Sequence, residues 1–203
     1  MREILFPGDV ISDRPIRMPN ATIANGVTIA TTLAMKESGK DHIVPLTGPW
    51  VPKAGDPVIG IVSATRGNMS EVDLSFFGRG LILYSKDSRD SKFAPGAAVE
   101  ATVKNVENRK DVILAFPTSL DGGIIVNVKP TKVPRIIGKA NTMIDQIAKL
   151  TRCKIAVGRN GMIWLDGGNV ALAIAAITKV EREAHTHGLT DRIREMLEKG
   201  FIE

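Results

Sequence analysis

A glycine followed by a lysine, Gly138-Lys139, is the part of this sequence best suited to contact an anion. Glycine has no Cβ, so a bulky ligand can approach the chain closely at that position. The amides at a helix N-terminus attract phosphate groups, and Lys139 adds a positive charge beside them. We therefore predict a phosphate-binding turn formed by Gly138, Lys139, Ala140 and Asn141. An ordinary connector between two helices is the alternative that the residues leave open.

The net charge of +5 is spread unevenly over the 203 residues. Between residues 129 and 159 there are eight basic residues and a single acidic residue, Asp145. A local positive field attracts polyanions whatever the total charge of the protein. This segment predicts a surface for an anionic partner, although a solvated basic face without a partner stays open. Four cations join the turn as candidate contacts: Lys132, Arg135, Lys154 and Arg159.

Residues that could carry catalysis are poorly placed along the chain. The histidines are His42, His185 and His187, and the closely spaced pair lacks a suitable third metal ligand nearby. Cys153 precedes an expected strand, which predicts a buried structural thiol. Gly167-Gly168 precedes a helix but lacks the lysine and threonine of a phosphate-binding P-loop. We therefore expect no catalytic residues, no metal, no cofactor and no enzymatic activity.

The composition is that of an ordinary folded protein, with 43% apolar and 24% charged residues. No apolar run approaches the roughly 18 residues of a membrane helix. The start of the chain, which reaches Pro7-Gly8-Asp9 at once, shows no apolar signal-peptide core. A single cysteine indicates a reducing compartment. We expect a cytoplasmic protein without a membrane partner.

Short β-branched runs separated by turn residues fill the first two-thirds of the chain. Residues 1–53 predict a small N-terminal β-domain, and the prolines around Trp50 suit a connector at its end. Residues 54–120 contain five short strands, which predicts a five-stranded OB-type barrel, a fold that binds oligonucleotides. These strands are expected at 58–64, 71–74, 80–84, 98–103 and 111–116.

The barrel also carries candidate contacts for a nucleic-acid strand. Phe76, Phe77 and Tyr84 could stack on bases, although packing in the core is the simpler expectation for each ring. Basic residues in this segment are balanced by acids, so the surface could touch phosphates without binding tightly. The candidate contacts are Arg66, Arg79, Lys86, Arg89, Arg109 and Lys110.

The last third, 121–203, changes to a helical period. A strand at 123–128 precedes a short helix at 134–137 and a second helix after Thr142, where Asp145 has capping-box spacing. Strands at 154–157 and 162–165 meet at Asn160-Gly161, a strong hairpin signal. A long helix at 169–185 and a short terminal helix follow. This β-α-α-β-β-α order is that of a type I KH domain, which clamps about four nucleotides with a G-x-x-G loop. Asn141 replaces the second glycine. The predicted fold class is α+β and multidomain.

Several segments then resemble a known family, the exosome RNA-binding cap subunit of the ribosomal RNA-processing protein 4 type. The resemblance is specific in the KH segment, over 132–139, 142–144 and 157–164, and the tail at 185–193 is similar to the archaeal form. Residues 55–62 and 71–74 resemble its S1 domain, and 7–10 its N-terminal β-domain. The usual aromatic residue before Val72-Asp73 is absent.

The resemblance implies a non-catalytic subunit of an RNA-degrading complex. Three cap subunits, with the possibility of mixed caps, would sit on a hexameric ring of RNase PH-like subunits and guide the 3′ end of single-stranded RNA into it. The N-terminal β-domain would dock on the ring, the S1 domains would line the pore, and the KH domains would lie further out. The strand could also pass mainly over the barrel. The alternative is a free-standing S1/KH RNA-binding protein of translation or ribosome assembly, and the nearly neutral 1–53 segment favours the cap.

Overall fold

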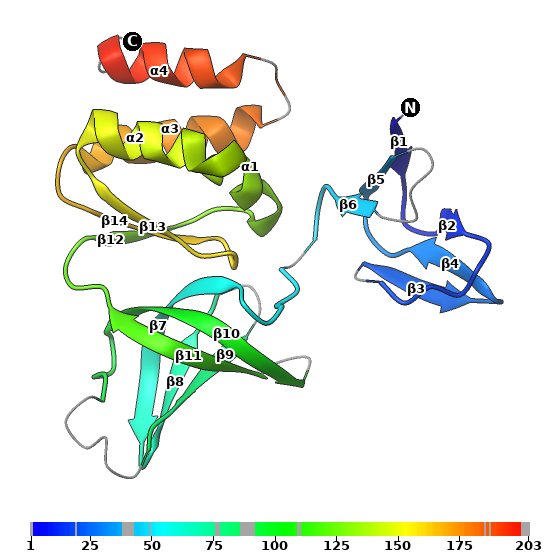
Figure 1. Cartoon of the computed structure of the whole chain (residues 1–203), viewed down its shortest axis with the longest axis horizontal. Helices are drawn as coiled ribbons and strands as arrows, with labels where there is room; N and C mark the ends of the chain where they lie inside the picture. Colours follow the sequence, from blue (N-terminus) through cyan, green and yellow to red (C-terminus); the bar gives the residue numbers. More distant parts are fainter. Residues whose placement is uncertain are drawn as a thin grey trace. The chain divides into compact units, whose positions relative to one another are not determined.

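The computed structural model describes residues 2–18, 20–37, 43–48, 50–75, 78–85, 92–108, 111–184, 186 and 188–199. The chain divides into two compact units, Met1–Val51 and Pro52–Glu203. The first holds only strands in its described part, and the second holds a β-barrel and an α+β layer (Figure 1). This confirms the α+β multidomain class.

The first unit contains two three-stranded antiparallel sheets. One has the order β1 (Arg2–Leu5), β5 (Ala34–Glu37), β6 (Ile43–Pro45), and the other β2 (Val10–Ser12), β4 (Val27–Ala30), β3 (Ala21–Ala24). Asn25 and Gly26 connect β3 to β4 with positive φ angles of 51° and 81°, as a tight hairpin turn requires. A small apolar core lies between the sheets, formed by Leu5, Ile11, Ala30, Ala34 and Ile43.

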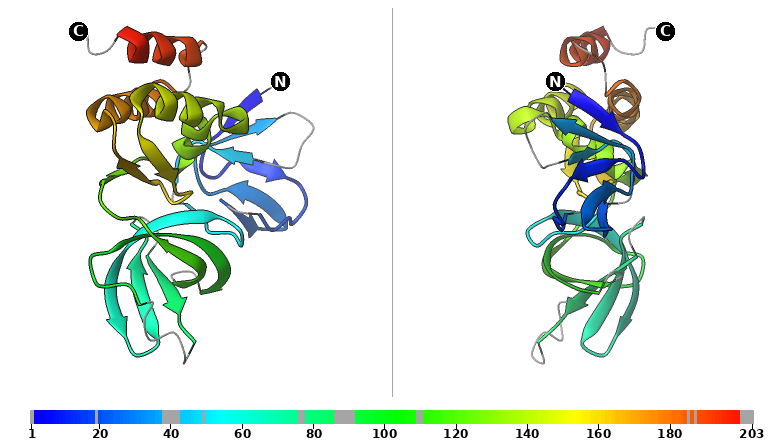
Figure 2. Two further views of the ribbon diagram at one scale, coloured as in Figure 1. Left: turned by 60° about the vertical axis from the view of Figure 1, so that its left-hand side comes forward. Right: turned by 90° about the vertical axis from the view of Figure 1, so that its right-hand side faces the viewer.

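The barrel of the second unit closes completely, in the order β10-β11-β9-β8-β7. Its strands are β7 (Pro57–Arg66), β8 (Met69–Asp73), β9 (Arg79–Leu83), β10 (Ala98–Asn108) and β11 (Asp111–Ser119). β9 and β11 pair in parallel, and the other pairs are antiparallel. A Cβ on Gly60 would lie 2.4 Å from Val72 Cγ1, so glycine is needed where the wall packs this tightly. The predicted five-stranded OB-type barrel is confirmed (Figure 2).

The remainder of the second unit has the predicted KH order. β12 (Ile124–Asn127) leads through the 3₁₀ turn η1 (Pro130–Lys132) to α1 (Val133–Ile137), the turn η2 (Lys139–Asn141) and α2 (Thr142–Thr151). β13 (Lys154–Val157), β14 (Met162–Asp166) and α3 (Val170–Glu183) follow. The strands form an antiparallel sheet in the order β12-β14-β13, with the helices on one face and the barrel on the side of the other (Figure 1).

Helix faces follow the apolar period of the sequence. α2 buries Met143 and Ile147, which are four residues apart, in the KH core. The additional helix α4 (Leu189–Lys199) buries Leu189, Ile193 and Leu197 and packs on α2 and α3. These contacts explain why a helix beyond the βααββα order is stable on this domain.

The starts of the helices differ from one another. The Asn169 side chain caps α3 by accepting a 3.0 Å hydrogen bond from the Leu172 N–H. The capping box expected at Thr142 and Asp145 is wrong, because α2 starts from Asn141, whose side chain makes no capping hydrogen bond. Within the described residues, no helix is long and apolar enough to span a membrane.

Candidate nucleic-acid interface

The bend between α1 and α2 combines an obligatory glycine with an exposed lysine. Gly138 has φ 78° and ψ 174°, and a Cβ there would lie 2.8 Å from both the Cβ and the N atom of Met143. Ala140 and Asn141 follow with left-handed φ angles of 51° and 62°. Lys139, Ala140 and Asn141 are exposed, and Lys139 forms no ion pair with any described residue. The bend therefore presents a free cation and strained backbone to solvent.

The predicted KH cations are partly gathered around this bend. Lys132 precedes α1, Arg135 lies on it, and Lys139 follows it. The five residues of α1 span about 7 Å. The Val128 N–H donates to the Gly161 carbonyl at 2.8 Å, which places the turn carrying Arg159 beside the chain that enters η1. Lys154 lies beyond the opposite end of α2, about 15 Å from the bend.

The predicted cations of the barrel do not join that group. The Nε of Arg79 donates to Asp111 Oδ1 at 2.9 Å, and its Nη1 lies 3.7 Å from Glu71 Oε2. The hydrogen bond and charge of Asp111, and to a smaller extent the charge of Glu71, raise the pKa of the Arg79 guanidinium above its usual value. The two carboxylates also balance the positive charge of Arg79. Arg66 ends β7, nine residues or about 30 Å along the strand from Pro57, the residue whose carbonyl accepts from the Arg159 N–H of the KH domain. Four of the predicted barrel cations lie outside the described residues: Lys86, Arg89, Arg109 and Lys110. Phe76 and Phe77 also lie outside them.

Asn160 has a role that the sequence did not reveal. Its side chain is 1% exposed, and its Nδ2 donates to the carbonyls of Ile59 (2.7 Å) and Leu74 (3.2 Å). Its Oδ1 accepts from the Ile59 N–H at 3.3 Å. The Arg159 N–H also donates to the Pro57 carbonyl at 2.7 Å. The turn between β13 and β14 is therefore fastened to strand β7 of the barrel.

The geometry of this turn differs from that of a two-residue Asn-Gly hairpin. The Gly161 N–H donates to the Gly158 carbonyl at 3.1 Å, so Arg159 and Asn160 are the central residues. Asn160 has no positive φ, whereas an Asn-Gly turn of the predicted kind needs one. A Cβ on Gly158 would lie 2.2 Å from Asn160 Oδ1 and 2.7 Å from the Ile59 N atom. Gly158 thus makes room for the asparagine to reach the barrel.

Apolar side chains continue the junction between the barrel and the KH sheet. Ile59 of β7 packs with Met162 and Trp164 of β14 in a buried cluster. The Trp164 Nε1 donates to the Gly122 carbonyl at 2.9 Å, which anchors the linker between the two folds. The barrel and the KH domain therefore form a single compact unit.

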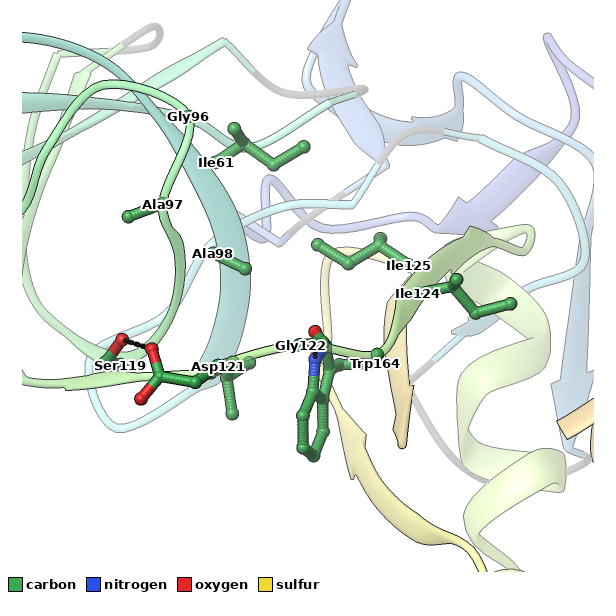
Figure 3. A pocket seen from close by; sticks show the side chains of 12 residues that line it. Ile61, Gly96, Ala97, Ala98, Ser119, Asp121, Gly122, Ile124, Ile125 and Trp164 are labelled. Atoms are coloured by element: carbon green, nitrogen blue, oxygen red, sulfur yellow. Dashed lines mark hydrogen bonds between the residues drawn. The ribbon is translucent and has the colours of Figure 1, made fainter. Parts of the chain in front are cut away.

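A hollow of about 580 Å³ opens beside this junction (Figure 3). Its walls are mainly small or apolar, and Trp164 and Ile125 line the KH side. Asp121 is the charged residue of the lining, and it accepts a 2.6 Å hydrogen bond from the Ser119 hydroxyl. Apolar walls with one carboxylate do not attract phosphate, so the hollow is not suited to bind a nucleic-acid backbone.

The candidates for metal binding and nucleophilic chemistry are the three histidines and Cys153. His42, His185 and His187 fall outside the described residues, and among those described no group of three His, Cys, Asp or Glu residues could hold a metal ion. Cys153 is buried, as expected, and its thiol donates to the Gly167 carbonyl at 3.0 Å.

Comparisons with known proteins agree with this architecture. A KH domain family model matches residues 123–171. Exosome complex component Rrp4 of Pyrococcus horikoshii is 35% identical over 100% of this chain and 88% of its own length, and that of Methanosarcina barkeri is 36% identical over 97% and 82%. A crystal structure described as an exosome complex RNA-binding protein superimposes with a TM-score of 0.65 at 30% identity, over 75% of this chain and 97% of its own. With its barrel, its KH domain and this similarity along the full length, the chain belongs to the Rrp4 family of exosome components.

Proposed function

We propose that this protein is an RNA-binding cap subunit of an exosome, which guides the 3′ end of single-stranded RNA into a phosphorolytic ring. The observation that carries the proposal is the exposed, lysine-bearing bend at 138–141 in the KH domain of an Rrp4-family chain. Lys139 and the neighbouring cations would contact backbone phosphates, which favours binding without strong sequence selectivity.

The three predicted segments would divide this work. Residues 1–53 would dock on a hexameric ring of RNase PH-like subunits, in three copies or together with other cap subunits. Residues 54–120 and 121–203 would contact RNA through the S1 barrel and the KH domain. The ring would carry the phosphorolytic chemistry, so the cap itself would cut nothing. We place this complex in the cytoplasm.

The sheet β1-β5-β6 supports docking by the first unit. Its register places Ile4, Met35 and Val44 in one row across the three strands. Ile4 is 58% exposed and Val44 48%, whereas Leu5 and Ile43 on the other face are buried in the core. An antiparallel sheet usually presents polar side chains on its solvent face. An apolar row on the outer face suits a protein partner.

Native mass spectrometry of the full chain, isolated from an extract of its own cells, tests the cap assignment directly. We expect an assembly of a six-subunit ring with cap subunits, including this chain. Recovery of the chain alone with RNA, or with ribosomal particles, would favour the free-standing S1/KH protein instead.

Charge reversal at Lys139→Glu should weaken RNA binding about tenfold and lower the salt slope by about one, because one phosphate contact is lost. Fluorescence anisotropy with a labelled oligoadenylate at several KCl concentrations measures both quantities. Arg194→Glu is the matched control, since it makes the same change in net charge at an exposed position on α4. Equal effects of the two substitutions would show that Lys139 makes no local contact.

A further inference from the structure

Phe116 of β11 is the most exposed of the large apolar side chains in the described structure. Val112 and Leu114 point into the barrel, and the alternation of a strand would place Phe116 inside as well. Instead its ring is 85% exposed, and its backbone has a positive φ of 52°. For a bulky residue this conformation is an outlier. The Phe116 ring is thus directed to solvent although this leaves an apolar side chain unburied and the backbone strained.

A β-bulge produces this orientation. Ala115 pairs with Thr102 and Thr118 pairs with Glu100, so Phe116 and Pro117 together face Ala101 alone. A bulge of this kind re-aims a side chain and is often found beside a functional site. Outliers of this kind are a reason to look for function, because folding alone would favour the relaxed, buried ring.

The strands paired with β11 place both apolar and charged residues near Phe116. β9 runs parallel to β11 with Ile82 opposite Leu114, so Leu83, which is 57% exposed, lies beside Ala115. On β10 the exposed Lys104 lies where Val103 pairs with Leu114, about 10 Å from Phe116 along the sheet. Lys104 forms no ion pair with a described residue, and Glu100 lies on the other side of the bulge.

We propose that Phe116 is a stacking platform for one base of single-stranded RNA on the barrel. This inference rests on the proposed function and adds a contact of a different kind from the phosphate contacts of the KH bend. A single flat and exposed ring has about the size of one base, and every base offers a π face to it. Lys104 is within reach of a phosphate next to the stacked nucleotide. Phe116 and the exposed Leu83 by themselves offer less apolar area than a stable protein interface buries.

The test compares the full-length wild type with Phe116→Asn, because asparagine tolerates the left-handed backbone and lacks the ring. Each protein is titrated with labelled oligoadenylate and with an abasic strand of the same length and charge. Stacking predicts that the substitution weakens oligoadenylate binding by about tenfold or more and leaves abasic binding unchanged. The salt slope should not change, since no phosphate contact is lost.

Phe116→Trp provides the gain-of-signal counterpart. Indole stacks as well as a phenyl ring, so affinity for oligoadenylate should be kept, and the new tryptophan fluorescence should be quenched on binding. Thermal unfolding of Phe116→Asn should occur at the wild-type temperature or above it, because an exposed ring and a strained backbone are removed together. That measurement separates a lost contact from a lost fold.

The inference would be overturned by unchanged oligoadenylate binding of Phe116→Asn, by an equal loss of affinity for the abasic strand, or by an altered salt slope. Lost association with the ring alongside intact RNA binding would assign Phe116 to a protein contact and would also overturn it. If the wild-type protein binds no RNA at all, both the stacking inference and the proposed function are wrong. If the wild type binds RNA and only the stacking prediction fails, the proposed function stands.

Discussion

Asn160→Ala is expected to lower the free energy of unfolding of the second unit by about 3–5 kcal/mol. The substitution leaves the N–H and C=O of Ile59 and the C=O of Leu74 buried without the partner they have in the wild type. Each buried polar group that loses its partner costs roughly 1–3 kcal/mol. Asn160→Asp should be no better, because a carboxylate keeps the shape of the side chain but cannot donate to either carbonyl.

Urea denaturation of the full chain measures this loss, and hydrogen exchange at the Ile59 amide reports it locally. Asn68→Ala is the matched control: Asn68 is exposed in the turn between β7 and β8, so its loss should change stability by less than about 0.5 kcal/mol. If Asn160→Ala behaved like this control, the asparagine would not be the fastening between the barrel and the KH domain.

Docking on the ring should be lost when the apolar row of the first unit is charged. The double substitution Ile4→Glu, Val44→Glu introduces two carboxylates that would lose water on docking without gaining partners. We expect association to weaken by more than about 100-fold, since each mismatch at an interface costs roughly 2 kcal/mol. Both side chains are exposed in the isolated chain, so the fold and the RNA affinity should be retained.

Binding to a reconstituted RNase PH-like ring, measured by sedimentation or surface plasmon resonance, provides the readout. Val106→Glu makes the same kind of change at a 37%-exposed position on the barrel and should leave ring binding intact. Wild-type affinity in the double variant would locate the docking surface on another face of the protein.

The spacing of apolar residues and the positions of turn residues were sufficient to predict the strands and helices of the second unit. The order β-α-α-β-β-α follows from local spacing, and the structure confirms it. The bend at Gly138 was also predictable, because a glycine between two helical segments already implies an unusual backbone. These features depend on residues that are close together in the sequence.

Contacts between residues that are far apart in the sequence could not be predicted in this way. Asn160 reads locally as part of a hairpin turn, but its partners lie up to 101 positions away. Arg79 reads as a free cation until Asp111, 32 positions later, is brought beside it. Phe116 is different, because Pro117 is a local signal for a bulge that disturbs the alternation of the strand. Its outward orientation could have been suspected from the sequence.

If Lys139 and Phe116 both contact RNA as proposed, the hydrogen bonds of Asn160 would make binding depend on the length of the strand. Since hydrogen bonds and apolar contacts join the barrel and the KH sheet within one compact unit, we expect the spacing between Lys139 and Phe116 to vary little. An RNA strand too short to reach both residues would gain only one of the two proposed contacts. Affinity would then rise with oligonucleotide length in a step, and short degradation products would leave the cap on their own.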